Sequence, residues 1–367
     1  MKKFNILVVD DSAYMRKLIT QKLEEDPVFS VVGIARDGLE AIEKVKRLKP
    51  DLVTMDIEMP KLNGIEALQK IMEDSPVPVV MLSSRTVEGA KDTIRALEIG
   101  AIDFFLKDTL INSEVSNKQV QEFFMRLKGI LKADRLINKP VTRTRTVEKP
   151  VVLKQPIEKP VIRPQIVEPR SISHKQVDLV FIGCSTGGPS ALQAILPHFT
   201  EDFPVPIVVA QHMPPGFTKP LADRFDTLCH IKVNEIQDGQ VMQAGNIYIA
   251  PSGYQTRFEK RQDGKVIFRV DNETKTQALY KPCIDISLTS AAPIFKDRLL
   301  SVILTGMGVD GMQGCGLVKE FQGTVFVEAE QSCVVYGMPR AVKEAGHADG
   351  QYILSQMYQE INSFVKK

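Results

Sequence analysis

A hydroxyl side chain that could act as a nucleophile stands in the run Gly-Cys-Ser-Thr-Gly-Gly at 183–188. An apolar stretch at 179–182 precedes the run, and a helix-like stretch at 189–196 follows it. Such a strand-to-helix turn lifts a serine out of a sheet and places it beside the unpaired N–H groups of a helix start. Ser185 is therefore the candidate nucleophile of a hydrolase.

Two further strand ends supply the base and the orienting acid that a serine nucleophile needs. His212 follows the apolar stretch 207–211, and Asp310 follows a predicted strand and a glycine-rich turn at 300–309. Because the carboxyl ends of parallel strands meet at one edge of a sheet, Ser185, His212 and Asp310 should share one crevice.

Another histidine competes for the role of base. Gly-x-Ser-x-Gly also fits the nucleophile elbow of α/β-hydrolases, whose chain order of serine, acid and histidine would select His347. No predicted strand delivers His347 to the crevice, so we favour His212. We interpret His174, His198 and His230 as structural or surface residues.

A second group of polar residues gathers at strand ends in the first third of the chain. Asp10 and Asp11 follow the first predicted strand, and Asp56 follows the third. Three carboxylates at one edge repel one another unless a hard cation joins them, and Mg²⁺ prefers oxygen ligands. Ser83 and Lys107 end the next two predicted strands, where they can hold the oxygens of a phosphoryl group.

The composition limits the classes of protein to which the chain can belong. A net charge of +2 does not indicate a nucleic-acid binder. Five cysteines without a Cys-x-x-Cys pair favour a reducing compartment with neither a disulfide framework nor a structural zinc site. No apolar run approaches the roughly 20 residues of a membrane span. We expect a cytoplasmic protein without direct membrane insertion.

The pattern of apolar residues predicts two α/β domains, as does a length of 367 residues at about 150 per domain. In 1–131, five apolar stretches alternate with amphipathic ones, which predicts a parallel sheet covered by helices on both faces. The segment 132–176 is rich in proline and lacks aromatic residues, so we predict an extended linker, or alternatively a strap along one domain. In 177–367 the alternation returns as a doubly wound, mostly parallel sheet, and Asp263-Gly264 predicts an antiparallel edge hairpin.

The N-terminal segment resembles the flavodoxin-like receiver domain of two-component response regulators. The resemblance rests on Val-Val-Asp-Asp-Ser at 8–12, Asp-Ile-Glu-Met-Pro at 56–60, Asn63-Gly64, Ser83-Ser84 and Phe-Phe-Leu-Lys at 104–107. It implies a histidine kinase as phosphodonor, with Asp56 as phosphoacceptor. Mg²⁺ would be bound by Asp10, Asp11, Asp56 and the backbone carbonyl of Glu58, and the switch residues would be Ser83, Phe104 and Lys107. Receivers usually carry proline after this lysine; Asp108 stands there, so the geometry of that loop is left open.

The second domain resembles the catalytic domain of the chemotaxis protein-glutamate methylesterases, and the whole chain is similar to those two-domain response regulators. The matching runs lie at 183–189, 209–214, 249–251, 304–311 and 336–340. The chain departs from the family pattern at Tyr-Lys-Pro-Cys-Ile-Asp (280–285), where members often carry a run like His-Arg-Pro-Ser-Val-Asp, and at Gln255, where histidine is common. These departures lie outside the predicted triad and leave the details of substrate contact open.

This resemblance implies a phosphorylation-activated serine hydrolase, recruited to membrane chemoreceptor arrays, that needs no cofactor for ester hydrolysis. Its substrates would be γ-glutamyl methyl esters of chemoreceptors, with deamidation of receptor glutamines as a second activity. Ser185, His212 and Asp310 would form the catalytic triad, and Thr186 and Met307 would support the oxyanion. Apart from the resemblance, we hypothesise that the unphosphorylated receiver packs over the crevice and that phosphorylation weakens this contact, because the linker keeps the two domains at a high effective concentration.

Two functions of other classes compete with this one. A docking or adaptor protein controlled by the receiver would need no catalysis, and a transcriptional regulator would carry a DNA-binding module after the linker. The absence of a basic stripe from 177–367 speaks against the second.

Overall fold

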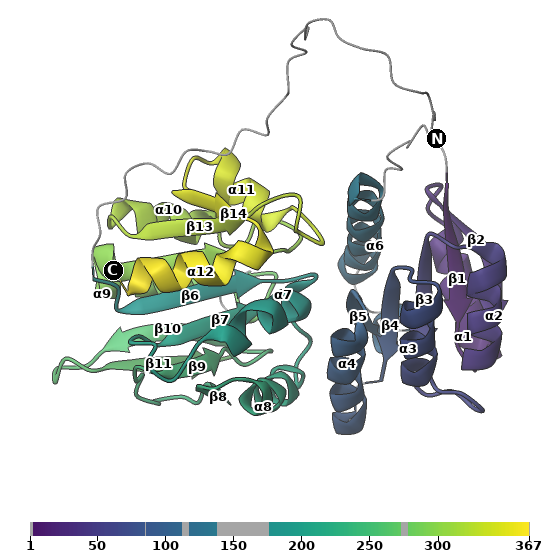
Figure 1. Cartoon of the computed structure of the whole chain (residues 1–367), viewed down its shortest axis with the longest axis horizontal. Coiled ribbons are helices and arrows are strands. Elements are labelled where there is room, and N and C mark those ends of the chain that lie inside the picture. The colour runs from purple at the N-terminus through teal and green to yellow at the C-terminus, as the bar shows by residue number, and fades with distance from the viewer. Residues whose placement is uncertain (1–2, 85, 112–116, 138–175, 273–277, 367) are drawn as a thin grey trace, which may run out of the picture.

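The chain forms two α/β bodies that lie side by side (Figure 1). The structure, a computed structural model, describes residues 3–84, 86–111, 117–137, 176–272 and 278–366. Most of the predicted linker at 132–176 lies outside these residues, so neither its extended form nor the strap is tested. Within the described residues, no helix combines the length and apolar character needed to cross a bilayer.

The N-terminal body is a five-stranded parallel sheet with the strand order β2-β1-β3-β4-β5. This order confirms the predicted flavodoxin-like fold. The strands are β1 (Phe4–Val9), β2 (Phe29–Ala35), β3 (Leu52–Asp56), β4 (Val79–Ser83) and β5 (Asp103–Leu106), and the helices are α1 (Ala13–Glu24), α2 (Gly38–Leu48), α3 (Gly64–Asp74), α4 (Val87–Ile99), α5 (Asp108–Ile111) and α6 (Asn117–Ile137).

Helix caps fix the turns that follow the strands of this body. The side chain of Ser12 accepts a hydrogen bond from the Met15 amide at the start of α1. Asn63 and Glu66 form a capping box at the start of α3, in which each side chain pairs with the other residue's backbone N–H. These caps hold the loops after β1 and β3 in place, and those loops carry the acidic residues.

The C-terminal body contains a seven-stranded sheet with the order β14-β13-β12-β6-β7-β9-β8, in which every pairing is parallel. Its strands are β6 (Leu179–Cys184), β7 (Ile207–Gln211), β8 (Lys232–Glu235), β9 (Asn246–Ile249), β12 (Leu299–Ile303), β13 (Thr324–Glu328) and β14 (Gly350–Tyr352). The helices are α7 (Gly188–Ile195), α8 (Thr218–Leu228), α9 (Ile284–Phe295), α10 (Met312–Glu320), α11 (Met338–Glu344) and α12 (Leu354–Val365), with 3₁₀ turns at η1 (Leu196–His198) and η2 (Lys296–Arg298).

The predicted hairpin is antiparallel and consists of β10 (Gln255–Lys260) and β11 (Val266–Asp271). It forms a two-stranded sheet of its own instead of extending the seven-stranded sheet.

The central strand β6 positions the candidate nucleophile. It lies between β12 and β7, with Gly183 opposite Ile303 on one side and Cys184 opposite Gln211 on the other. The residues just past these pairs therefore emerge together at the carboxyl edge of the sheet. In open α/β sheets, binding sites lie at this edge, where neighbouring connections run to opposite faces.

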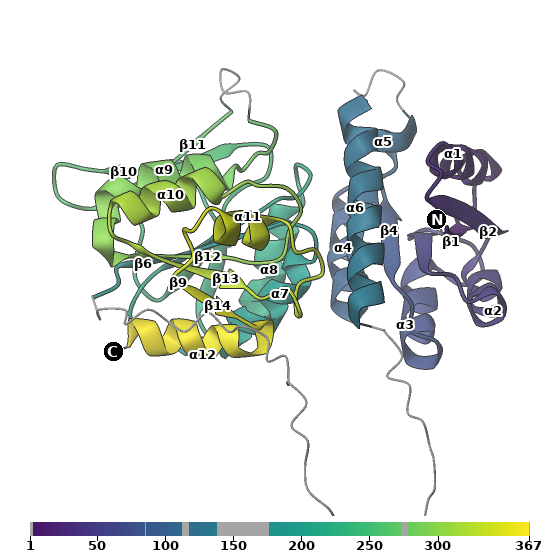
Figure 2. The ribbon, with the colours of Figure 1, turned by 90° about the horizontal axis from the view of Figure 1, so that it is seen from above.

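The face of the N-terminal body formed by α4, β5 and α6 is turned toward the C-terminal body, as both ribbon views show (Figures 1 and 2). The ring of Phe104 in β5 stacks on that of Phe217, before α8, with centroids 4.7 Å apart. Glu98 of α4 pairs with Arg224 of α8. One apolar cluster contains buried residues of both bodies, so the contact between them is part of the core.

A glycine at the start of α3 is required by the backbone around it. A Cβ atom at Gly64 would lie 1.9 Å from the carbonyl oxygen of Asp56, and backbone cannot yield as a flexible side chain can. We predict that Gly64→Ala lowers the free energy of unfolding of the N-terminal body by about 1–3 kcal/mol, as overpacking does. Chemical denaturation measures this, with Lys70→Ala on the exposed side of α3 as control. Equal stability of the two variants would contradict the prediction.

Candidate functional site

The acidic residues predicted at the strand ends of the N-terminal body lie together. Ligand oxygens of Asp10, Asp11 and Asp56 all lie within 4.8 Å of one another. Lys107 Nζ, at the end of β5, lies 2.9 Å from Asp10 Oδ2 and 2.7 Å from Asp56 Oδ2. The carboxylates of Asp10 and Asp56 are buried, whereas Asp11 is exposed.

Burial controls the charge of this group. It raises the pKa of Asp56 to about 6, against the opposing effect of the Lys107 ammonium. Burial lowers the pKa of Lys107, but the ion pairs with Asp56 and Asp10 outweigh it, so the net shift is upward. Lys107 thus stays charged beside a carboxylate that is ionised at neutral pH.

The donor set fits a hard divalent cation. Asp10 Oδ2 is buried and makes no hydrogen bond of regular geometry, although the Lys107 ammonium is near. Asp11 adds an exposed carboxylate. Oxygen ligands of this kind suit Mg²⁺, which keeps several coordination positions for water and phosphate.

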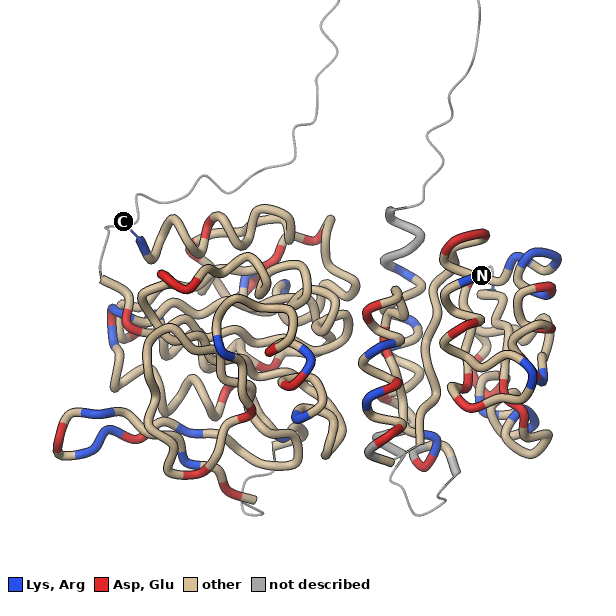
Figure 3. The backbone as a smooth tube through the Cα atoms, turned by 60° about the horizontal axis from the view of Figure 1, so that its bottom comes forward, with Lys and Arg blue, Asp and Glu red and all other residues tan. Residues whose placement is uncertain are grey.

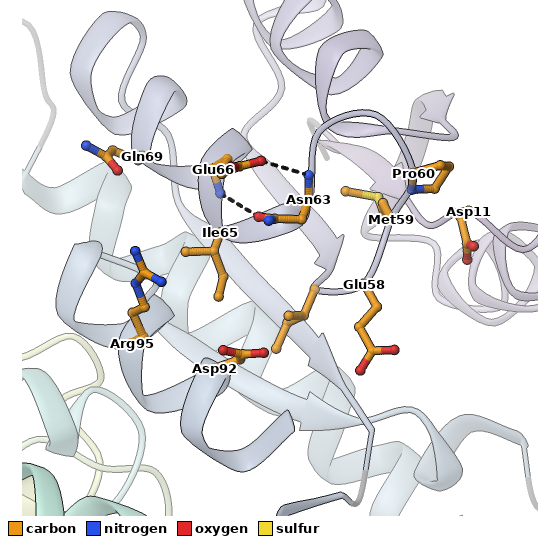
Figure 4. Close-up of a pocket in the computed structure, with 11 residues that line it drawn as sticks. Asp11, Glu58, Met59, Pro60, Asn63, Ile65, Glu66, Gln69, Asp92 and Arg95 are labelled. Atoms are coloured by element: carbon orange, nitrogen blue, oxygen red, sulfur yellow. Dashed lines mark hydrogen bonds between the residues drawn. The ribbon is translucent and has the colours of Figure 1, made fainter. Parts of the chain in front are cut away.

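A cavity of about 610 Å³ lies beside these carboxylates (Figure 4). The loop after β3 and the start of α3 form one wall, and Asp92 and Arg95 of α4 form the other. Asp11 belongs both to the lining of the cavity and to the acidic group. The acidic group is therefore reached from solvent through this opening.

The three predicted switch residues lie in different surroundings: Ser83 contacts α4, Phe104 stacks on Phe217, and Lys107 pairs with the acidic residues. Ser83 Oγ donates to the backbone oxygens of Ser84 and Gly89 and accepts a hydrogen bond from Thr93 Oγ1 at 2.8 Å. Its hydroxyl therefore bonds toward α4 and makes no hydrogen bond with Asp56. Asp108 begins the short helix α5, so replacing the usual proline leaves the ion pairs of Lys107 intact.

In the C-terminal body, Ser185 and His212 emerge from neighbouring strands. The His212 amide donates to the Cys184 carbonyl at 3.0 Å. The buried side-chain amide of Gln211 donates to the carbonyl oxygens of Ser185 and His212, at 3.0 and 2.9 Å. Among the described residues, no hydrogen bond joins the Ser185 hydroxyl to the His212 ring; catalytic hydrogen bonds of this kind often tighten only in the complex with substrate.

A short hydrogen bond links His212 to Asp310, between Nε2 and Oδ2 at 2.8 Å. An ionised carboxylate only accepts, so Nε2 carries the proton and Nδ1 is left with its lone pair. Nδ1 is buried and has no hydrogen-bond partner in the described part of the chain. The imidazole is therefore in the tautomer that can take a proton at Nδ1.

Asp310 is held as a carboxylate. Burial alone would raise its pKa, but His212 and the backbone amides of Asp285 and Ile284 lower it to about 2. Those amides donate to Asp310 at 2.9 and 2.8 Å. Asp285 also accepts from the amides of Gly311 and Gly314, which fixes the loop behind Asp310.

Backbone donors surround the serine turn. Within the described residues, the backbone N–H groups of Thr186 and Met307 donate no hydrogen bond. Gly306 brings the two loops close, because a Cβ atom there would lie 2.9 Å from Ser185 Cβ. The turn can therefore offer N–H groups to an oxyanion.

The competing histidine lies elsewhere. The ring of His347 packs near Gly316 of α10, where a Cβ atom would meet its Nε2 at 3.0 Å. His198 packs on Tyr358 of α12, and His230 is exposed. The prediction for His174 lies outside the described residues.

Sequence reasoning missed two residues that support this site. The only sequence signal for Gln211 was a polar residue at the end of an apolar strand, where a buried side-chain amide can hold two neighbouring loops together. Asp285 was visible as an acidic residue in the first turn of α9.

The N-terminal body lies against the loops that carry the site. Met307 and Val334 pack on the apolar cluster that contains Phe123 and Leu127 of α6. Burial raises the pKa of Asp103 in β5, whereas Arg126 of α6 and Thr186 of the serine turn act to lower it. Thr186 Oγ1 is buried and makes no hydrogen bond of regular geometry within the described residues. In Figure 3, acidic and basic residues are interspersed along both bodies.

Comparison with protein-family models matches residues 180–361 to "CheB methylesterase" and residues 6–115 to "Response regulator receiver domain". A curated relative from Thermotoga maritima, named protein-glutamate methylesterase/protein-glutamine glutaminase, is 44% identical over 351 residues, covering 95% of this chain and 94% of its own. A relative of the same name from Vibrio parahaemolyticus is 41% identical and covers 93% of each chain.

Among solved structures, the catalytic domain of the Thermotoga maritima CheB methylesterase is 42% identical, with a TM-score of 0.50. It matches over its whole length and covers 52% of this chain. The predicted resemblance and both predicted fold types are thereby confirmed.

The hydrogen bond between Asp310 and His212 leads to a prediction for the rate of ester hydrolysis. Asp310→Asn removes the acceptor that fixes the imidazole tautomer, so we expect the rate of ester hydrolysis to fall by roughly 10³–10⁴. Methanol release from a methyl ester substrate measures this, with Asp223→Asn on the exposed side of α8 as control. A loss of less than tenfold in Asp310→Asn would contradict the role assigned to this pair.

Proposed function

Because the chain belongs to the CheB methylesterase family of response regulators, we propose how its two sites produce protein-glutamate methylesterase activity under the control of phosphorylation. The enzyme hydrolyses γ-glutamyl methyl esters to glutamate and methanol, and it deamidates glutamine. The relatives' shared name and the paired receiver and esterase domains carry this function; they give no support to an adaptor or a transcriptional regulator.

The catalytic steps follow from the hydrogen bond between His212 and Asp310. Ser185 Oγ attacks the ester carbonyl while His212 Nδ1 takes the hydroxyl proton. Asp310 stabilises the imidazolium through Nε2. The methanol leaving group then receives the proton, and a water molecule repeats the attack on the acyl-enzyme. The same steps release ammonia from a γ-carboxamide.

The amides of Thr186 and Met307 would stabilise the oxyanion of both tetrahedral intermediates. One such donor typically contributes about 10²–10³ in rate. This assignment is supported by the free N–H groups beside the serine turn.

The receiver site would hold Mg²⁺ through Asp10, Asp11, Asp56 and the Glu58 carbonyl oxygen. When bound, the ion neutralises charge on the incoming phosphoryl group. Asp56 is the proposed phosphoacceptor, a histidine kinase the proposed donor, and the cavity beside α3 the route of approach. Lys107 would hold a phosphoryl oxygen, because its ammonium already lies beside Asp56.

The receiver would restrain hydrolysis by packing on the loops of the active site. Phosphorylation draws the Ser83 hydroxyl away from α4 toward the phosphoryl group, and the space beside β5 changes. Phe104 then leaves its stacking position on Phe217, which loosens the contact between the bodies. A coupling of about 1–3 kcal/mol would change activity from severalfold to about a hundredfold.

The place of action and the domain limits belong to the same proposal. Chemoreceptors are the proposed substrates, and the enzyme would act in the cytoplasm at receptor arrays. The receiver would end near residue 131 and the catalytic domain would begin near 177.

The assigned nucleophile is tested by removing its hydroxyl. Methylated chemoreceptor membranes incubated with wild type and a small acyl phosphate should release methanol, and Ser185→Ala should lose more than a thousandfold in rate, on the scale reported for catalytic triads. Ser190→Ala on α7 is the matched control. Methanol release by Ser185→Ala near the wild-type rate would refute the assignment.

The restraint is tested at the ion pair between Glu98 and Arg224. Glu98→Arg puts two cations together at the contact, so activity without phosphorylation should rise about two- to fivefold, within the range of an exposed pair. Adding Arg224→Glu restores opposite charges and should return activity to the wild-type level. Asp74→Lys, which disrupts the Lys46 ion pair on the receiver alone, is the control. The proposed restraint is wrong if Glu98→Arg and Asp74→Lys behave alike.

A further inference from the structure

Three of the residues at which this chain departs from its family's usual pattern, Gln255, Tyr280 and Cys283, lie together behind His212. Gln255 opens β10 and is fully buried. Its side-chain amide donates to the Tyr280 carbonyl at 2.9 Å and accepts from the Cys283 amide at 2.8 Å. One side chain thus fixes both ends of the segment 280–283.

Each end of that segment contacts a member of the catalytic pair. The ring of Tyr280 stacks on the imidazole of His212, with centroids 4.1 Å apart and planes inclined by 14°. The thiol of Cys283 donates to Asp310 Oδ1 at 3.2 Å, while Oδ2 of the same carboxylate accepts from His212. The segment therefore contacts the pair on a ring face and on a carboxylate oxygen.

We propose that Gln255, Tyr280 and Cys283 form one positioning layer, which holds His212 with Nε2 on Asp310 and Nδ1 free for proton transfer. The proposal rests on the catalytic roles proposed above for His212 and Asp310. Stacking on Tyr280 restricts rotation of the imidazole. The Cys283 thiol bonds to Asp310 Oδ1, so that Oδ2 is the oxygen left for His212 Nε2. The departures thus act on the base, and not on substrate contact, which sequence reasoning had left open.

The thiol acts here as a hydrogen-bond donor and not as a nucleophile. Burial and the nearby Asp310 carboxylate raise the pKa of Cys283 to about 12, so the sulfur keeps its proton at neutral pH. A serine hydroxyl can make the same contact as a stronger donor, whereas alanine cannot. This difference allows loss of the contact to be separated from loss of the side chain.

The experiment compares kcat and KM for methanol release from methylated chemoreceptor membranes, using the full chain with a saturating acyl phosphate. Cys283→Ala should lower kcat roughly three- to tenfold with KM unchanged, as loss of a weak donor to a charged group predicts. Cys283→Ser should restore kcat. Tyr280→Leu should lower kcat about two- to tenfold through lost stacking, and Tyr280→Phe should retain it.

Two controls separate positioning from stability and from the catalytic assignment itself. Cys315→Ala removes another buried thiol, which contacts Ser301, and should lower Tm without changing kcat of the folded protein. The ¹⁵N-detected resonance of His212 Nε2–H should shift in Cys283→Ala and not in Cys315→Ala. Wild-type kcat in Cys283→Ala, or failure of serine to restore it at equal Tm, overturns the layer. Activity retained by Ser185→Ala would instead overturn the triad.

Discussion

The buried carboxylate of Asp310 is the interaction on which the catalytic body depends. An ionised group inside a protein is tolerated only when donors surround it, and four do so here: one imidazole, two backbone amides and one thiol. Those donors come from the strand end of β7 and the start of α9, so satisfying one charge ties distant loops together. The same charge selects the histidine tautomer. The donors around Asp310 therefore serve both the packing of these loops and the orientation of the imidazole.

The two bodies solve a similar electrostatic problem in different ways. At Asp310, fixed donors make the carboxylate a poor base, which suits a group that only orients its neighbour. At Asp56, burial and neighbouring acids oppose ionisation, and a single ammonium compensates in part. A further cation beside Asp56 would therefore favour its ionised form. The surroundings of the two aspartates, and not the residue type, shift the pKa of Asp310 downward and that of Asp56 upward.

Much of this arrangement could be predicted from the sequence, because parallel strands deliver whatever follows them to one edge. That rule placed Ser185, His212 and Asp310 together, and it also gathered the acidic residues of the receiver. It could not show which imidazole nitrogen meets the carboxylate, since that depends on ring orientation. Nor could it place the Tyr280 ring, which a loop outside the sheet brings to the site. The short polar strand β14 carries no apolar pattern, so it was not predicted.

The stacked rings of Phe104 and Phe217 belong to different domains yet fill one apolar core. Neither side chain can change in size without altering the fit of the other, so the two domains must diverge in step during evolution. A chimaera that joined a receiver from another protein to this esterase would thus contain two folded domains whose contact surfaces do not fit each other. The two domains are separate in the sequence, but a regulatory contact between them would depend on side chains of both.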